Sequence, residues 1–191
     1  GTRYASGWTE MAAPYPTCHL NGSLLPLAEA RISPLDRGFL FADGVYEVIP
    51  VHRGRPFRLR QHLRRLDDSL AAIRLRNPHR EIVQRNNLVE GIIYMQVTRG
   101  AEPGRNHLFP SDATPTVFAF ASPFPAPAAR TLEHGLSAVT LQDIRWDRCD
   151  IKSVALLANV LLRQEAQDQG GAEAILHRDG HVTEGSSSTV F

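Results

Sequence analysis

Three prolines within six residues, in Ser122-Pro123-Phe124-Pro125-Ala126-Pro127, limit most strongly what this chain can fold into. Proline has no backbone N–H and a fixed φ, so neither a helix nor a central strand can pass through such a segment. The prolines therefore predict a stiff, extended linker over residues 122–130. We expect a flexible lead-in over residues 1–19, one domain over residues 20–121, and the opening part of a second domain over residues 131–191.

Hydrophobic periodicity predicts an α+β domain before the linker. Leu63, Leu66, Leu70 and Ile73 recur every three or four residues, which predicts a helix from about residue 61 to Asn77-Pro78. A weaker helical pattern follows at 81–88. Strands are predicted at 45–49, 51–52, 57–60, 92–98 and 116–121, with a turn at 53–55.

The part after the linker also mixes helix and strand signals. A strand is predicted at 136–141, and an apolar helix face at 154–162 ends at Gly170-Gly171. Residues 174–176 and 182–184 flank Arg178-Asp179-Gly180, which predicts a hairpin. About 60 residues are too few to form a convincing core alone. The chain begins at Gly1, although Met11 could be the initiator, and it ends within a strand-like run, so we expect a fragment.

Composition excludes several classes of protein. With 42% hydrophobic residues in 191, the chain is neither disordered nor fibrous. It has no apolar run of about 18 residues for a membrane helix and no signal-like N-terminus. Its two cysteines are too few for a disulfide scaffold, and its eight histidines lack metal-ligand spacing, so we expect no metal site. We predict a soluble, cytoplasmic protein.

The Arg-rich stretch from Arg53 to Arg85 leaves a nucleic-acid-binding module open as an alternative, although the net charge of the chain is only +1. Phe57 is the single aromatic residue there, so no stacking surface accompanies the ten arginines. A solvated helix face is the commonest meaning of such a run. The sequence also lacks a Gly-x-Gly-x-x-Gly motif, a P-loop and a Gly-x-Ser-x-Gly elbow.

Lysine usage is the most informative count. Of 21 basic residues, 20 are arginine and only Lys152 is lysine. Arginine replaces lysine at most solvated positions, but it cannot lose its proton. A chain that uses arginine at every other basic position is expected to keep lysine where a neutral amine is needed, as in a Schiff base. A leftover surface lysine is the alternative.

Five ordered blocks surround this lysine at compatible spacing, and together the chain from residue 20 to 191 resembles the class IV (fold type IV) pyridoxal-phosphate aminotransferases, most closely those acting on D-amino acids. The blocks are Asp36-Arg37-Gly38-Phe39, residues 41–48, Gln96-Val97-Thr98-Arg99-Gly100, Asp150-Ile151-Lys152-Ser153 and residues 182–188. The resemblance implies a two-domain architecture with a complete small N-terminal α/β domain and a truncated larger C-terminal domain.

The resemblance also implies a role for each matched residue. Lys152 would carry pyridoxal 5′-phosphate as a Schiff base and transfer a proton. Glu184 would keep the pyridine nitrogen protonated. The remaining implied site residues are Arg65 for the phosphate, Ser187 beside the cofactor, Tyr46 in the active site, and Arg105 and His107 as the substrate carboxylate trap from the facing subunit of a homodimer.

The implied reaction is ping-pong transamination between a D-amino acid, such as D-alanine, and a 2-oxo acid, with the fragment inactive alone. A branched-chain L-amino acid aminotransferase and an aminodeoxychorismate lyase remain alternatives within the family. Two positions depart from its pattern: Ala42 replaces the usual glycine, and Gly104 lengthens the loop before Arg105.

Overall fold

The computed structural model describes residues 13–78, 90–112, 114–124 and 127–191. Their contacts divide the chain into two compact units. We call residues 13–124 with 148–155 the N-terminal unit, and residues 127–147 with 156–191 the C-terminal unit. Within the described ranges, no helix is both long and apolar enough to cross a membrane. The helix predicted at 81–88 lies outside the described residues.

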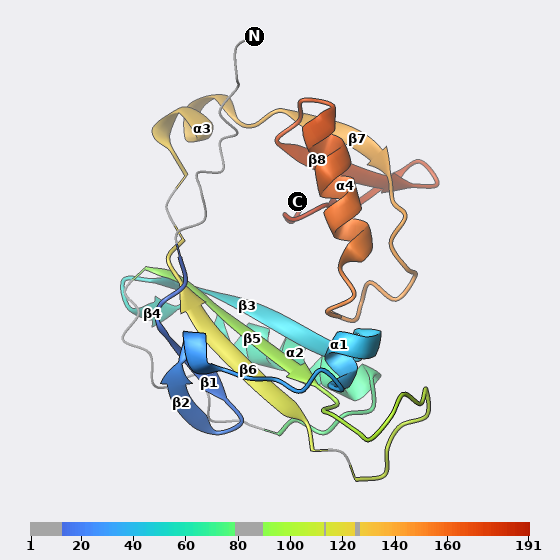
Figure 1. The fold of residues 1–191 in the computed structure, drawn as a ribbon. Helices are drawn as coiled ribbons and strands as arrows, with labels where there is room; N and C mark the ends of the chain where they lie inside the picture. The colour runs from blue at the N-terminus through green and yellow to red at the C-terminus, as the bar shows by residue number, and fades with distance from the viewer. Residues whose placement is uncertain (1–12, 79–89, 113, 125–126) are drawn as a thin grey trace. The chain divides into compact units, whose positions relative to one another are not determined.

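The N-terminal unit is built on a six-stranded antiparallel sheet (Figure 1) with the strand order β2-β1-β6-β5-β3-β4. The strands are β1 (Thr17–Leu20), β2 (Ser23–Pro26), β3 (Gly44–His52), β4 (Arg55–Pro56), β5 (Gly91–Thr98) and β6 (Thr116–Ser122). A 3-10 turn η1 (Leu27–Glu29) and the helices α1 (Arg37–Phe41) and α2 (Leu59–Ala72) complete the unit.

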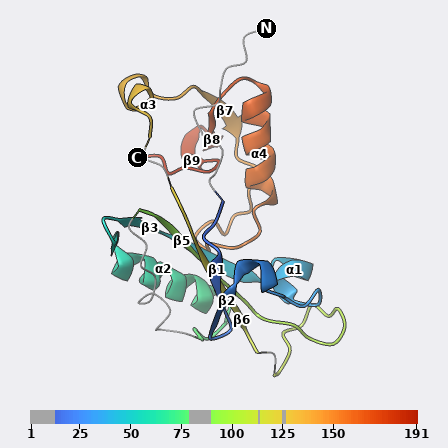
Figure 2. The same ribbon diagram turned by 60° about the vertical axis from the view of Figure 1, so that its left-hand side comes forward.

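The core of this unit lies between α2 and the sheet, as Figures 1 and 2 show from two directions. Alternate residues of β5 are buried, including Ile93, Met95 and Val97, because successive side chains of a strand point to opposite faces. Leu66 and Leu70 of α2 close the core from the other side. The predicted helical and period-two patterns are therefore confirmed here.

The C-terminal unit holds a three-stranded sheet of β7 (Ala138–Gln142), β8 (Glu173–Arg178) and β9 (His181–Gly185). β7 and β8 are parallel, and β8 and β9 form the predicted hairpin. The helix α3 (Ala129–His134) opens the unit, and α4 (Leu157–Asp168) packs Leu162 and Ala166 against the sheet. The strand and the helix in this part thus form close to where periodicity predicts them. The predicted apolar face of the helix is wrong, because Leu157, Val160 and Leu161 are exposed.

The structure differs from the sequence expectations at several places. The linker predicted over residues 122–130 is shorter, because β6 includes Ser122 and α3 begins at Ala129. The strand predicted at 57–60 is wrong: Arg58 adopts a left-handed φ of 48° and the chain enters α2 at Leu59. Thr17–Leu20, expected within the lead-in, form β1. Residues 148–155, expected with the C-terminal part, cluster with the N-terminal unit, where Ile151 is buried in the core.

Candidate active site

The backbone of Lys152 is held by two elements of the N-terminal unit. Its N–H donates to Oγ of Ser69 on α2 at 3.2 Å, and its carbonyl accepts from the N–H of Tyr46 on β3 at 3.0 Å. A further bridge pairs Ser153 with Val45, and Val154 donates to the Gly44 carbonyl at 3.1 Å. Because the N–H and the carbonyl of Lys152 are both hydrogen-bonded, the position of its Cα is fixed relative to α2 and β3.

The amine of Lys152 lies over the ring of Tyr46, with Nζ 4.3 Å from the ring centre. The Tyr46 ring stacks on Tyr94 with a centroid distance of 5.7 Å, and the Tyr94 hydroxyl donates to Gln96 at 2.7 Å. Burial, with the charge of Tyr46, raises the pKa of Tyr94 to about 12, so this donor keeps its proton at neutral pH. Within the described residues no carboxylate pairs with the Lys152 amine.

Arg65 on α2 forms a two-point ion pair with Glu47 on β3. Its Nε and Nη2 donate to the two carboxylate oxygens at 2.8 and 2.6 Å, and His62 Nδ1 lies 3.1 Å from Oε1 of Glu47. Burial alone would raise the pKa of Glu47, but the hydrogen bonds from Arg65 and the Val48 N–H outweigh it and hold this pKa below its usual value. The ion pair leaves about half of the Arg65 side chain exposed and its guanidinium fixed in orientation.

Glu184 and Ser187 lie together at the end of β9 in the C-terminal unit. Oε1 of Glu184 accepts from the N–H groups of Gly185 and Val190 at 3.3 and 3.1 Å. The turn is tight, because a Cβ added at Gly185 would stand 2.5 Å from the carbonyl oxygen of Ser188. This geometry requires glycine between the predicted cofactor carboxylate and the serines.

A buried carboxylate that the sequence did not single out holds this turn. Glu173 on β8 is 8% exposed and accepts hydrogen bonds from the hydroxyl and N–H of Ser186 and, at 2.8 Å, from the hydroxyl of Ser187. The hydrogen bonds of Ser186, the Ala174 N–H and Ser187 outweigh the effect of burial and lower the pKa of Glu173. The Ser-rich turn is therefore anchored to β8.

Arg105 and His107 lie on the exposed loop between β5 and β6, and both contact Phe41 at the end of α1. The Arg105 guanidinium carbon is 4.7 Å from the Phe41 ring centre, and the His107 ring is 5.1 Å from it. The structure therefore brings the two residues of the predicted carboxylate trap onto one aromatic ring. No hydrogen bond, ion pair or ring contact joins either residue to Lys152 in the described part of the chain.

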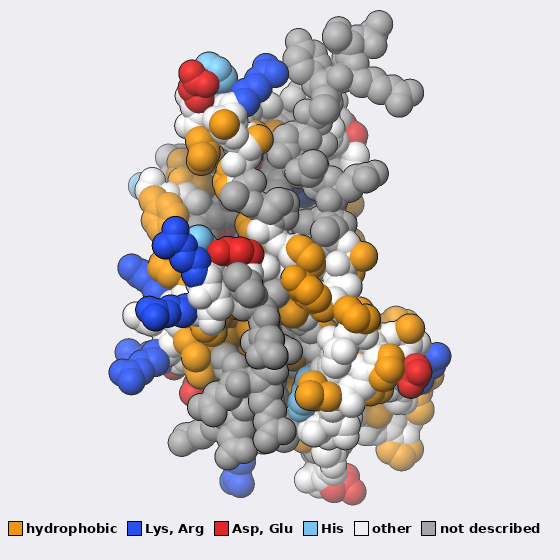
Figure 3. All heavy atoms as spheres, turned by 90° about the vertical axis from the view of Figure 1, so that its left-hand side faces the viewer, with side chains coloured by type: hydrophobic (Ala, Val, Ile, Leu, Met, Phe, Trp, Pro, Cys, Tyr) orange, Lys and Arg blue, Asp and Glu red, His pale blue; other side chains and the backbone are white. Residues whose placement is uncertain are grey.

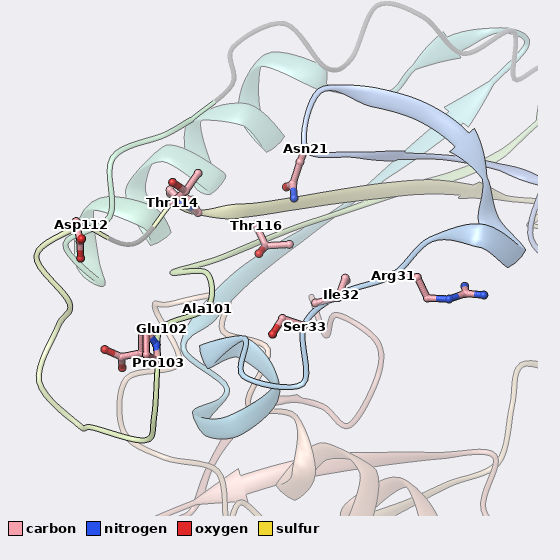
Figure 4. A pocket seen from close by; sticks show the side chains of 11 residues that line it. Asn21, Arg31, Ile32, Ser33, Ala101, Glu102, Pro103, Asp112, Thr114 and Thr116 are labelled. Atoms are coloured by element: carbon pink, nitrogen blue, oxygen red, sulfur yellow. The ribbon is translucent and has the colours of Figure 1, made fainter.

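A cavity of about 450 Å³ lies beside the same loop and is lined by Asn21, Arg31–Ser33, Ala101–Pro103, Asp112 and Thr114–Thr116. Figure 4 shows the lining side chains contributed by the loop before α1 and by the β5–β6 loop. None of the seven predicted site residues lines this cavity, so it does not mark the predicted site.

The seven predicted site residues thus fall into three pairs and one single residue. Tyr46 and Lys152 touch, Arg105 and His107 share Phe41, and Glu184 and Ser187 share a turn. Arg65 stands with Glu47 on the N-terminal unit. Sequence reasoning missed Glu47 and Glu173, because the burial of a carboxylate in a strand is visible only once the strands pair. No group of three or more His, Cys, Asp or Glu residues suited to a metal occurs among the described residues.

The fold is that of aminotransferases of known structure. It matches a branched-chain amino acid aminotransferase of Escherichia coli with a TM-score of 0.77 at 24% identity, over 89% of this chain and 62% of that one. It also matches the pyridoxal-phosphate-bound form of a hypothetical aminotransferase from Mycobacterium tuberculosis, with a TM-score of 0.69 at 24% identity, over 89% of this chain and 65% of that one. These likenesses establish the architecture of the chain.

Sequence relatives establish the family. The chain is 43% identical over 180 residues to a D-alanine aminotransferase of Bacillus licheniformis and 42% identical over 182 residues to one of Staphylococcus haemolyticus. These matches span 90% of this chain and 63% and 64% of the relatives. Residues 44–191 match the family described as amino-transferase class IV. The chain belongs to the class IV aminotransferase family.

Proposed function

We propose that the full-length protein uses pyridoxal 5′-phosphate to transfer an amino group between a D-amino acid, such as D-alanine, and a 2-oxo acid. The observation that carries this proposal is the single lysine of the chain. Lys152 has its backbone held on both sides and its amine against an aromatic ring, without a carboxylate partner among the described residues. A lysine amine can lose its proton and form a Schiff base whereas an arginine cannot, so Lys152 is the side chain of this chain suited to that chemistry.

The donor set of the chain suits this cofactor. When bound, pyridoxal phosphate withdraws electrons from the Cα of the amino acid. Lys152 would hold the cofactor through Nζ and move the proton at Cα, and Glu184 would keep a proton on the ring nitrogen. Arg65 would bind the phosphate, since a guanidinium is suited to phosphate oxygens, and Ser187 would lie beside the cofactor. Tyr46 would lie beside the bound ring.

The substrate carboxylate is assigned to Arg105 and His107. Both are exposed cation-forming side chains on one loop, and a guanidinium binds a carboxylate through two parallel hydrogen bonds. We propose that they act in the facing subunit of a homodimer, because neither contacts Lys152 through a hydrogen bond or ring contact in the described chain. We place the enzyme in the cytoplasm.

D-Amino acid substrates are favoured over branched-chain L-amino acids by the relatives. The two D-alanine aminotransferases are 42–43% identical to this chain, whereas the branched-chain enzyme of Escherichia coli is 24% identical and supports the fold alone. No specific observation favours an aminodeoxychorismate lyase. A nucleic-acid-binding module is less well supported, because Phe57 is the single aromatic residue of the Arg-rich stretch and the net charge of the chain is only +1. On the face drawn in Figure 3, Lys and Arg side chains gather along the left-hand edge beside hydrophobic side chains.

Borohydride reduction tests the central assignment. The full-length protein incubated with pyridoxal phosphate and reduced is expected to carry the cofactor mass on the peptide containing Lys152. Lys152→Arg should lose both this adduct and D-alanine transamination, because an arginine side chain cannot deprotonate. Exposed Arg55→Lys, which offers a second lysine in the same unit, is the control and should not acquire the adduct. An adduct retained in Lys152→Arg would remove Lys152 from its role.

A further inference from the structure

The β5–β6 loop that bears Arg105 and His107 has no helix or strand of its own between residues 102 and 112, yet two buried arginines hold it. Arg37, at the start of α1, is 3% exposed, and Arg99, just after β5, is 5% exposed. Both are charged groups inside the N-terminal unit, and buried charges persist only where partners satisfy them. Both arginines contact residues of the loop, and both bind the carboxylate of Asp43.

Arg37 reaches the loop directly beneath the predicted trap. Its Nη1 donates to the carbonyl oxygen of Asn106 at 2.6 Å and to the carboxylate of Glu102, and its Nη2 lies 3.5 Å from the carbonyl oxygen of His107. Its guanidinium carbon also stands 4.8 Å from the Phe41 ring centre. A single side chain thus contacts the backbone of two residues adjacent to or within the trap and the ring on which the trap rests.

Arg99 holds the far end of the loop. Its guanidinium carbon is 3.7 Å from the ring centre of Phe109, and its Nη2 donates to the Ile73 carbonyl at 2.7 Å. A cation this close to an aromatic face contributes favourable electrostatic energy in addition to packing. Phe109 lies two residues after His107, so the loop is fastened on both sides of the trap.

Asp43 joins the two arginines. Its Oδ2 accepts from Nε of Arg37 and from Nε of Arg99, each at 2.8 Å, and its Oδ1 accepts from Nη2 of Arg99 at 3.1 Å. Burial alone would raise the pKa of Asp43, but the hydrogen bonds from Arg99 and Arg37 outweigh it and lower this pKa, so the carboxylate stays charged. With Glu102, the cluster contains two positive and two negative groups.

We propose that Arg37, Asp43 and Arg99, which we call the loop clamp, are positioning residues that set the placement of Arg105 and His107 and thereby the affinity for the substrate α-carboxylate. This inference rests on the proposed function, which assigns the binding of the substrate carboxylate to Arg105 and His107. The clamp touches the backbone and flanks of the trap, and leaves the side chains of Arg105 and His107 free to meet a carboxylate. Loosening the clamp is expected to misplace the trap while the lysine chemistry persists.

The test uses two variants of the full-length holoenzyme. Arg37→Gln with Glu102→Gln removes one positive and one negative charge together, so no buried charge is left unpaired. Phe109→Leu removes the ring beneath Arg99 with little loss of volume and keeps every charge. Arg31→Gln is the matched control, since Arg31 is an exposed arginine of the same unit that donates to the carbonyls of Ala28 and Ala30.

Both clamp variants should raise KM for D-alanine by about fivefold or more and change kcat by less than twofold. Kinetics with a primary amine that lacks a carboxylate should stay unchanged, because such a substrate does not use the trap. Amide hydrogen exchange at residues 102–109 should accelerate in the clamp variants alone. An unchanged KM in both variants, or an equal loss with the carboxylate-free amine, overturns the inference.

These outcomes are distinct from failure of the proposed function. If the wild-type protein forms the Lys152 adduct but transaminates no D-amino acid, the substrate assignment fails and the exchange data still report whether the clamp holds the loop. If D-alanine is a substrate and the clamp variants behave as Arg31→Gln does, only the clamp inference fails. Should the double variant fail to fold, Phe109→Leu carries the test alone.

Discussion

Arg65 on α2 and Glu47 on β3 form a bidentate ion pair, with Nε–Oε2 and Nη2–Oε1 distances of 2.8 and 2.6 Å. Glu47 is completely buried, whereas about half of the Arg65 side chain reaches solvent. Within the described residues, Nη1 of Arg65 has no hydrogen-bond partner. The pair therefore orients a guanidinium with one donor group left for an anion.

Glu47→Gln is expected to weaken the binding of inorganic phosphate and of pyridoxal phosphate. The neutral amide loses charge-assisted hydrogen bonds worth about 1.5–3 kcal/mol, so the urea midpoint of the protein should fall and Arg65 should lose its fixed orientation. Equilibrium titration of the apoenzyme and urea unfolding measure the two effects. Glu90→Gln is the control, because Glu90 is an exposed carboxylate beside His52. Equal behaviour of the two variants would contradict the orienting role.

The longer elements could be predicted from the sequence because their periodicity is physical. β5 and β6 alternate buried and partly buried residues along most of their length, and Leu66 and Leu70 form the buried stripe of α2. The β1–β2 hairpin was missed because each strand has four residues and only Cys18 is buried. The Asn21-Gly22 dipeptide, with positive φ at both residues, was the available signal for it.

The chemistry of Lys152 could be anticipated, whereas its supporting residues could not. One lysine among twenty arginines stands out in any reading of the chain. Glu47, Glu173 and Asp43 act through partners that only tertiary pairing brings near, such as Ser186 for Glu173 across thirteen residues. Spacing does not reveal which carboxylate becomes buried, and the roles of the seven site residues remain predictions.

Acid stability should depend on Asp143 of the C-terminal unit. Hydrogen bonds from Arg145 and Thr183 outweigh burial and lower the pKa of Asp143 well below its usual value. Since the unfolded chain binds a proton near pH 4 and the folded chain does not, this stabilisation is complete above about pH 4 and is lost as the pH falls toward the lower folded value. Asp143→Asn should reduce the slope of urea midpoint against pH below about 4.

Asp150→Asn is the matched control for this pH dependence. Asp150 binds Arg148 through two hydrogen bonds at 2.8–2.9 Å, as Asp143 binds Arg145, but its side chain is 60% exposed instead of 2%. Solvent screens the exposed pair, so Asp150→Asn should leave the slope nearly unchanged. A similar loss of slope in both variants would show that burial of Asp143 is not the cause.

Glu173→Ala should release the Ser186–Ser187 turn and weaken cofactor retention. The substitution leaves the buried Ser186 hydroxyl without its acceptor, at a cost of about 1–3 kcal/mol, and removes the partner of the exposed Ser187 hydroxyl. We expect about a tenfold higher dissociation constant for pyridoxal phosphate. Titration of the apoenzyme by absorbance measures this constant. Glu165→Ala removes an exposed carboxylate of α4 that accepts from Gln169, and should not change it.

Arg105→Ala should reduce kcat/KM for D-alanine by about ten- to a hundredfold, because an oriented charged hydrogen bond contributes about 1.5–3 kcal/mol. The loss should extend to the 2-oxo acid, which carries the same carboxylate, and spare a primary amine without one. Arg130→Ala, which removes an exposed arginine of α3, is the control.

The wild-type enzyme is assayed beside both variants with D-alanine, D-glutamate, L-alanine and L-leucine as donors. A preference for L-leucine would replace the D-specific assignment with the branched-chain alternative. Unchanged D-alanine kinetics in Arg105→Ala would mean that the loop lengthened by Gly104 presents another residue to the carboxylate.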